Sequence, residues 1–311
     1  MPSYSGVWTL PAQYQAKGSG LWPPNYVLPI GLFGGGSGPL SSIDYFNMSS
    51  TGNATFFGNL TQARMATSAF GSTTRSVWAS GGVSGTATNT IDYVTPTSTG
   101  NATSFGQLNF TSNDSNGGGC NSSTRGLAGG GYPGTASISI DYVTIASTGN
   151  ATAFGTLSVT SVKFVGCCSS PTRGVWVGGA NAGGTAQSVM QYVTIATTGN
   201  TTSFGFLTSV GEGAIAASNS TRAIVYKNTA IEYFTIATTG NATSFGTCSA
   251  TYYGQSGCAS STIAVAKEQY GNSNVLNYVT ISTTGNATLF GYLATARSFP
   301  GAVSNFNGGV Q

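Results

Sequence analysis

The sequence predicts an all-β fold: a six-bladed β-propeller of four-stranded blades, closed by strands from both ends of the chain. Three observations predict it. A unit of about 47 residues recurs six times, and each copy is rich in the β-branched and aromatic residues that favour strands. The two ends of the chain together supply the residues of one repeat, as a closed ring requires.

The composition describes one folded chain with a neutral, hydroxyl-rich surface. Of 311 residues only 17 are charged (10 basic, 7 acidic), none is histidine and 46 are glycine. Regularly spaced Tyr, Phe, Val and Ile supply enough apolar area for a core, so disorder is rejected for most of the chain. The scattered Lys and Arg form no basic stripe, which argues against nucleic-acid binding.

The chain divides into an arm at residues 1–25 and a propeller at residues 26–311. The arm has no counterpart in the repeats and is dense in aromatic residues, among them Trp8, Tyr14 and Trp22. Each large apolar side chain left in water loses roughly 1.5 to 3 kcal/mol of burial free energy. We therefore expect the arm to dock onto a neighbouring subunit. The alternative is that it folds back over its own propeller.

The start of the chain and its apolar runs predict no membrane insertion. No apolar run approaches the about 18 residues of a transmembrane helix, and the first residues lack the basic-then-apolar pattern of a signal peptide. We expect a chain made in the cytoplasm without a signal peptide.

The strongest recurring unit is a Tyr-bearing strand, a Gly-Asn pair and a strand that carries Phe-Gly. A glycine always follows the tyrosine seven residues later. The six tyrosines are Tyr45, Tyr93, Tyr142, Tyr192, Tyr233 and Tyr278. Because glycine and asparagine accept positive φ, a Gly-Asn pair between two strand-forming runs predicts a two-residue hairpin turn.

Two further strands precede each Tyr strand. The nearer one often ends in glycines, as at residues 34–36 and 178–179, and a weaker apolar run such as residues 214–217 comes before it. Four antiparallel strands per repeat make a propeller blade, and radial repetition protects the sheet edges.

The spacing of the Gly-Asn asparagines tests ring closure. The spacings are 48, 49, 50, 41 and 45 residues; 25 residues follow Asn286 and 28 run from Tyr26 to Asn53. Together the two ends hold about one repeat, so one blade is shared between the termini. We expect its first strand near residues 302–306 and the other three in the segments from Leu28, Ile43 and Ala54.

Three of the five cysteines, Cys120, Cys168 and Cys258, occupy one matching position of three repeats. Other repeats place Phe70 and Ala217 there. A position that accepts Cys, Phe or Ala packs in the core, which favours buried free thiols over a disulfide framework.

Charged residues recur at two positions of the repeat. Arginine opens an inner strand at Arg75, Arg125, Arg173 and Arg222, and an acid precedes the tyrosine at Asp44, Asp92, Asp141 and Glu232. The arginines either form a ligand ring or, as we favour, pack their stems and bond turn carbonyls. Antiparallel geometry places arginine and acid at opposite ends of one blade, so they should not pair.

Loop length varies at one end of the blades. The loops between the Gly-Gly position and the Tyr strand have 6, 8, 8, 10, 2 and 6 residues, and repeats five and six carry Lys227-Asn228 and Glu268-Gln269 instead of Gly-Gly. Binding commonly uses exposed loops on a rigid scaffold. We expect ligand or partner contacts on this variable-loop face. The alternative is that the loop sequences have drifted in solvent without a binding role. The candidate contact residues are Tyr132, Asn181, Lys227, Glu268 and Tyr270.

No catalytic or metal-binding constellation is recognisable in the sequence. The chain has no histidine, which is a usual ligand of zinc, copper and non-haem iron sites. Its seven acidic residues are scattered and give no paired carboxylates for glycoside cleavage. We expect no enzyme activity, no metal and no cofactor.

The repeat resembles the kelch, or galactose-oxidase, class of propeller repeats over residues 26–311, through its Gly-Gly strand, Tyr strand, Phe strand and Arg-bearing link. The galactose-oxidase copper site needs histidine and is not rebuilt in this chain. Residues 141–157 resemble kelch-like repeats of virion and tail proteins of marine tailed bacteriophages. Residues 6–10, with 13–16 and 22–23, are similar to leader segments of the same proteins.

This resemblance implies a structural or adsorption protein of a phage virion, on the tail, fibre, baseplate or capsid. Its partners would be other virion proteins, bound through the arm, and a host surface glycan. A free carbohydrate-binding lectin is the alternative, and an intracellular kelch-like scaffold is a third class.

Overall fold

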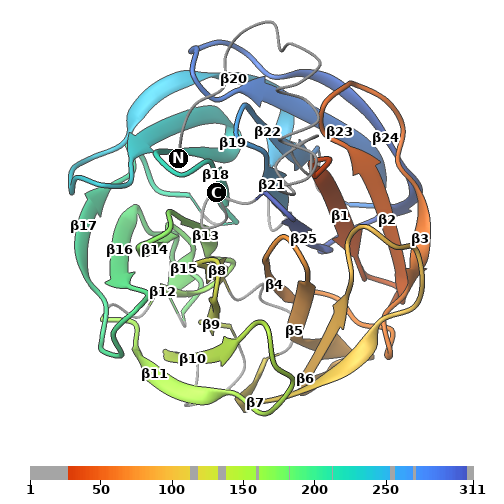
Figure 1. The fold of residues 1–311 in the computed structure, drawn as a ribbon. Helices are drawn as coiled ribbons and strands as arrows, with labels where there is room; N and C mark the ends of the chain where they lie inside the picture. The colour runs from red at the N-terminus through yellow and green to blue at the C-terminus, as the bar shows by residue number, and fades with distance from the viewer. Residues whose placement is uncertain are drawn as a thin grey trace, which may run out of the picture.

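The structure is a computed structural model, and it describes residues 27–112, 118–131, 138–158, 161–181, 183–211, 213–252, 256–268 and 271–306. These residues form six blades of four antiparallel strands around a central axis (Figure 1). The predicted six-bladed propeller is confirmed. The described residues contain no helix, so none that is long and apolar enough to cross a bilayer. The predicted arm lies outside the described residues.

In the first three blades the strands follow one another from the axis outward. Blade 1 consists of β25 (Gly301–Ser304), β1 (Ile30–Gly34), β2 (Ser42–Asn47) and β3 (Thr55–Asn59). Blade 2 consists of β4 (Ser68–Gly71), β5 (Ser76–Val83), β6 (Thr86–Val94) and β7 (Thr103–Ser112). Blade 3 consists of β8 (Gly118–Asn121), β9 (Arg125–Gly129), β10 (Ser139–Thr144) and β11 (Thr152–Thr156).

The other three blades have the same order. Blade 4 has β13 (Gly166–Ser169), β14 (Arg173–Val177), β16 (Val189–Thr194) and β17 (Thr202–Phe206), with a small sheet of β12 (Ser161–Lys163) and β15 (Ala180–Asn181) beside it. Blade 5 has β18 (Ile215–Ser218), β19 (Arg222–Thr235) and β20 (Thr243–Tyr252); the two halves of β19 pair with β18 and β20 and fill both middle positions. Blade 6 has β21 (Gly257–Ala259), β22 (Ile263–Lys267), β23 (Ser273–Thr280) and β24 (Thr288–Arg297).

Strands from both ends of the described chain close the ring in blade 1. The C-terminal β25 pairs antiparallel with β1, with Gly31 opposite Ser304 and Gly34 opposite Gly301 (Figure 1). The Asn305 side chain reinforces this joint, because its Oδ1 accepts a bond of 2.7 Å from the Ile30 amide. The predicted shared blade is therefore confirmed.

The core lies between the blades, in apolar clusters that each combine residues of two neighbours. One cluster joins Leu127 and Phe154 of blade 3 to Trp176 and Val193 of blade 4. Within every blade the repeat tyrosine packs edge to face against the phenylalanine of the outermost strand, with ring centroids 5.5 to 6.0 Å apart. No blade buries its apolar surface alone.

The Gly-Asn pair is a clasp between blades, so the predicted two-residue hairpin turn is wrong. In blade 4 residues 195–201 separate β16 from β17, and the Gly199 amide donates to the Phe154 carbonyl of blade 3 at 2.9 Å. The Asn200 Oδ1 accepts from the Thr156 amide at 3.0 Å. The same two bonds recur at all six junctions, including the one from Gly52 and Asn53 of blade 1 to blade 6.

The Phe-Gly glycine makes this clasp possible. A Cβ added at Gly155 would lie 2.1 Å from the Gly199 carbonyl oxygen, and the equivalent glycines give 2.0 or 2.1 Å. These glycines are Gly58, Gly106, Gly205, Gly246 and Gly291. Glycine is needed at this position for the close approach of two backbones.

Candidate functional site

The two faces of the ring differ in what they present. Loops of variable length and the blade-to-blade crossings lie on one face, called the variable-loop face. The Gly-Asn loops and the turns that follow the innermost strands lie on the other, the Gly-Asn face. Figure 1 shows the innermost strands gathered around the axis.

The cavity that the described residues enclose on the central axis is small. Its lining comes from all six blades and consists largely of small residues such as Gly119, Gly166 and Ala302, and its volume is about 50 Å³. That volume holds a few water molecules. The rings of Phe164 and Phe299, 6.0 Å apart, lie near its variable-loop end.

Strained backbone surrounds this end of the channel. Phe164 and Phe299 both have φ of 52°, and Ala66 has 57°, in the left-handed region that favours glycine. Gly213 takes the same position in blade 5 with φ of 72°. All four lie two residues before an innermost strand, so the left-handed conformation belongs to the sharp crossing into blades 1, 2, 4 and 5.

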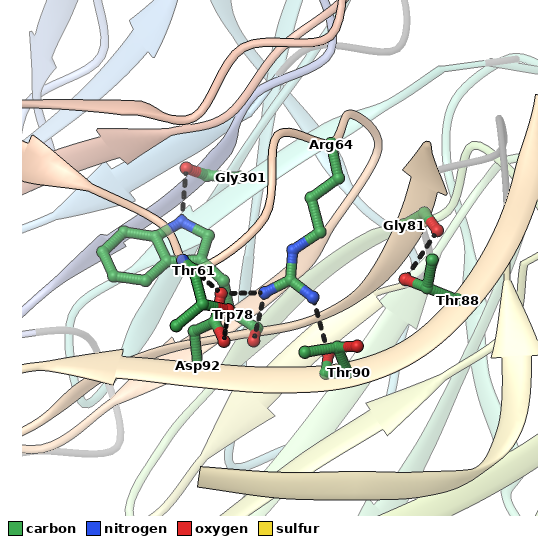
Figure 2. Close-up of polar contacts among 8 residues, drawn as sticks. All are labelled: Thr61, Arg64, Trp78, Gly81, Thr88, Thr90, Asp92 and Gly301. Atoms are coloured by element: carbon green, nitrogen blue, oxygen red, sulfur yellow. Dashed lines mark hydrogen bonds and ion pairs between the residues drawn. The ribbon is translucent and has the colours of Figure 1, made fainter. Parts of the chain in front are cut away.

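A buried ion pair anchors the crossing from blade 1 to blade 2. The Arg64 guanidinium lies 2.8 Å from Asp92 and also donates to the carbonyls of Thr90 and Trp78 (Figure 2). The Asp92 carboxylate accepts from the amide and hydroxyl of Thr61, at 3.2 and 2.5 Å. Burial lowers the pKa of Arg64, and Asp92 offsets only part of this effect.

The residue before the repeat tyrosine also contacts the preceding crossing in blades 1, 4 and 5. Arg297 pairs with Asp44 at 2.7 Å. Glu232 accepts from the Thr208 amide at 3.0 Å and pairs with Lys227 of its own strand at 2.7 Å. In blade 4 the neutral Gln191 accepts from the Ser158 amide at 2.9 Å. Asp44, Asp92 and Glu232 therefore pair with cations other than the four inner-strand arginines, which agrees with the prediction that acid and arginine do not pair within a blade.

Blade 3 departs from this pattern. Asp141 is 2 % exposed, and its carboxylate accepts from the amide and side chain of Asn109, at 2.7 and 3.1 Å. Burial raises the pKa of Asp141, while the Asn109 bonds lower it. A hollow of about 430 Å³ lies against it, lined also by Phe110 and Phe154.

Three of the predicted contact residues fall in the described chain, and the structure does not bring them together. Lys227 is 1 % exposed and bonds Glu232 and Ser209, so its side chain offers no surface to a ligand. The half-buried Asn181 accepts from the Thr185 amide at 2.9 Å, and Glu268 accepts from the Ser249 hydroxyl. The remaining candidates lie outside the described residues; they are Tyr132, Tyr270, Trp8, Tyr14 and Trp22.

Lys267, which the repeat pattern does not single out, is fully buried beneath the variable-loop face. Its ammonium group donates to the carbonyls of Glu268 and Gly271 at 3.2 and 3.3 Å. Burial lowers its pKa to about 7, Arg297 contributes in the same direction, and Glu268 opposes them.

We expect the free energy of unfolding to increase between pH 7 and 9 and to decrease above pH 9. In the first window Lys267 keeps its proton in the unfolded chain, where its pKa is 10.5, but releases it in the folded chain near pH 7. One such group contributes up to about 1.4 kcal/mol per pH unit. Above pH 9.0 the unfolded thiols ionise, whereas burial raises the pKa of folded Cys168 and Cys258.

Urea denaturation at a series of pH values measures this profile. The Lys267→Met variant should lose the rise between pH 7 and 9 and keep the fall above pH 9. A rise of the same size in the variant would assign the effect to another group.

All five cysteines are free, as predicted. Cys120, Cys168 and Cys258 are buried at the position that Phe70 and Ala217 fill in other blades. Together with Cys248 they serve as core residues, and only Cys167 is half-buried.

On the Gly-Asn face, arginines bridge neighbouring blades. Each inner-strand arginine lies 4.5 to 4.7 Å above the tyrosine ring of its own blade. Its guanidinium also donates to one or two carbonyls of the next blade, as Arg125 does to Ile195 and Ala196 at 3.1 and 2.8 Å. The predicted structural role of these arginines is confirmed.

The same face carries two equivalent hollows, in blades 3 and 6. A hollow of about 210 Å³ in blade 3 is lined by Tyr142, Thr148 and Asn150, with Phe105 of blade 2. The equivalent residues of blade 6, with Phe245 of blade 5, line a hollow of about 250 Å³; its polar lining includes Tyr278, Thr284 and Asn286. The lining presents hydroxyls, amides and the tyrosine, and no charge.

Among the described residues, no three His, Cys, Asp or Glu side chains come together as a metal site would need. No protein-family model and no curated protein sequence matches this chain.

Proposed function

We propose that this chain is a non-enzymatic structural and adsorption protein of a phage virion, and that its propeller presents one face to a host glycan or a partner subunit. The single observation that carries the glycan part is the pair of equivalent hollows on the Gly-Asn face. The virion context comes from the resemblance of the repeats and the leader segment.

The chemistry of these hollows suits a neutral sugar. Threonine hydroxyls and the asparagine amide exchange hydrogen bonds with sugar hydroxyls, and the uncharged lining imposes no cost on a neutral ligand. Hollows of 210 and 250 Å³ fit one sugar unit and bind it weakly. Two equivalent hollows on one rigid ring raise the avidity for a polymer of repeating sugars.

This proposal moves the glycan contacts from the variable-loop face, where the sequence favoured them, to the Gly-Asn face. On the variable-loop face, Lys227 is buried and the channel behind Phe164 is narrow. Partner contacts of the arm are a separate matter and stay a prediction.

A glycan array probed with the isolated protein tests sugar recognition. Thr148 and Thr284 are exposed in the two hollows, so Thr148→Trp with Thr284→Trp should fill them and weaken binding about tenfold. Thr86, exposed on the variable-loop face, gives the matched control Thr86→Trp, which should bind as the unaltered chain does. Equal losses in both variants would contradict the location.

A mass-spectrometric inventory of purified particles tests the virion role. Stoichiometric presence of the chain supports it. Glycan binding by a chain that is absent from particles would favour the free lectin instead.

A further inference from the structure

Four of the six blade junctions are bridged by an arginine on the Gly-Asn face. Arg75, Arg125, Arg173 and Arg222 carry their guanidinium groups from blades 2 to 5 to the carbonyls of blades 3 to 6. The accepting carbonyl always belongs to the residue three positions after the repeat tyrosine, as in Ile145 after Tyr142.

The other two junctions carry isoleucine at the arginine position. The strand registers place Ile30 of blade 1 and Ile263 of blade 6 opposite Asn47 and Thr280, as Arg125 lies opposite Thr144. Isoleucine has no hydrogen-bond donor in its side chain. Within the described residues, no cation lies above the rings of Tyr45 and Tyr278 as one does in blades 2 to 5.

A hollow of about 310 Å³ lies at the junction of blade 6 with blade 1. Met48 and Ser49, which line it, correspond to Ile195 and Ala196, the carbonyl acceptors of Arg125. The opposite wall is the turn of residues 260–262, which immediately precedes Ile263. The hollow therefore lies where the other junctions hold a guanidinium group.

We propose that this hollow, called the closure-junction site, binds the arginine side chain of a partner subunit. Met48 and Ser49 stand at the positions whose carbonyls hold a guanidinium group at four other junctions of the same ring. A guanidinium also matches two adjacent carbonyls better than an ammonium does, because its donors are planar and fixed. Val27 and Phe306 also line the site.

The proposed function places this chain in a virion with other subunits, and the closure-junction site would bind an arginine of one of them. Only the identity of that partner rests on the proposed function. Binding of arginine itself is a property of the isolated chain. The two are therefore tested separately.

The probe is the tripeptide acetyl-Gly-Arg-Gly-amide, titrated into the full chain and followed by the amide resonances of Ser49 and Ser261. Citrulline in place of arginine keeps the shape and removes the charge, and should bind at least about tenfold more weakly. The Ile263→Arg variant should abolish binding, because its own guanidinium fills the site. The matched control Ile30→Arg adds the same charge at the junction of blades 1 and 2 and should leave binding unchanged.

Three results would overturn the site: no binding to the unaltered chain, equal binding of the citrulline peptide, or unchanged binding to a folded Ile263→Arg variant. If Ile263→Arg does not fold, the comparison of the arginine and citrulline peptides still decides whether the site recognises a guanidinium group. Ile263→Arg that loses peptide binding yet still enters particles would overturn the partner assignment and leave the virion role intact. A chain absent from all particles would reject the virion role whatever the peptide does.

Discussion

Replacement of Gly155 by alanine is expected to lower the free energy of unfolding by about 3 to 4 kcal/mol. The new Cβ would lie 2.1 Å from the Gly199 carbonyl oxygen, so β11 and the blade 4 loop must separate. Separation strains two packed backbones and weakens the bonds at Phe154 and Thr156, each worth about 1 kcal/mol. Urea denaturation followed by tyrosine and tryptophan fluorescence measures the change.

Gly199 is the matched control, since it lies in the same clasp on the other blade. A Cβ at Gly199 meets nothing within 4 Å and its φ lies outside the left-handed region, so Gly199→Ala should change stability by less than about 1 kcal/mol. Similar losses in the two variants would show that chain stiffness, and not the close approach at Gly155, decides the outcome.

Removal of the buried cation in Arg64→Met is expected to cost about 3 to 5 kcal/mol. The side chains of Arg64 and Asp92 are both 0 % exposed, so the variant would leave the Asp92 carboxylate buried without its counter-charge. The carbonyls of Thr90 and Trp78 would lose their guanidinium donor as well (Figure 2).

The double variant Arg64→Met with Asp92→Asn is expected to recover about 1 to 2 kcal/mol of that loss, because no unpaired charge remains. Asparagine still accepts the Thr61 amide, which reproduces the neutral arrangement of Gln191 and Ser158 in blade 4. A double variant less stable than Arg64→Met would contradict this explanation.

Periodicity predicted the fold because every blade repeats one strand pattern, and residue counting alone located the shared blade. The contacts between neighbouring blades were harder to predict from the sequence. The Gly-Asn pair has the composition of a tight turn, but its partners, such as Phe154 for Gly199, belong to the preceding repeat. Local turn chemistry carries no information about contacts between repeats.

The prediction of Lys227 as a surface contact is wrong for a related reason. Lys227 stands out in sequence because it replaces a glycine, yet Glu232 follows five residues later and neutralises it in the core. Arg64 and Arg297 were not predicted, although a signal was present. Each follows the leucine after a Phe-Gly strand by four residues, and each precedes a blade whose tyrosine is preceded by aspartate.

The clasp at Gly199 and Asn200 has a consequence for how such rings grow. Every junction uses the same two segments in the same direction, so a duplicated repeat would bring its own junction with it. The number of blades must then be decided at the axis. There a Cβ at Gly119 would already lie 2.3 Å from the Ala69 carbonyl oxygen, around a cavity of about 50 Å³. Fewer blades would leave these strands no space and more would open a water-filled bore, so small residues at the axis select six.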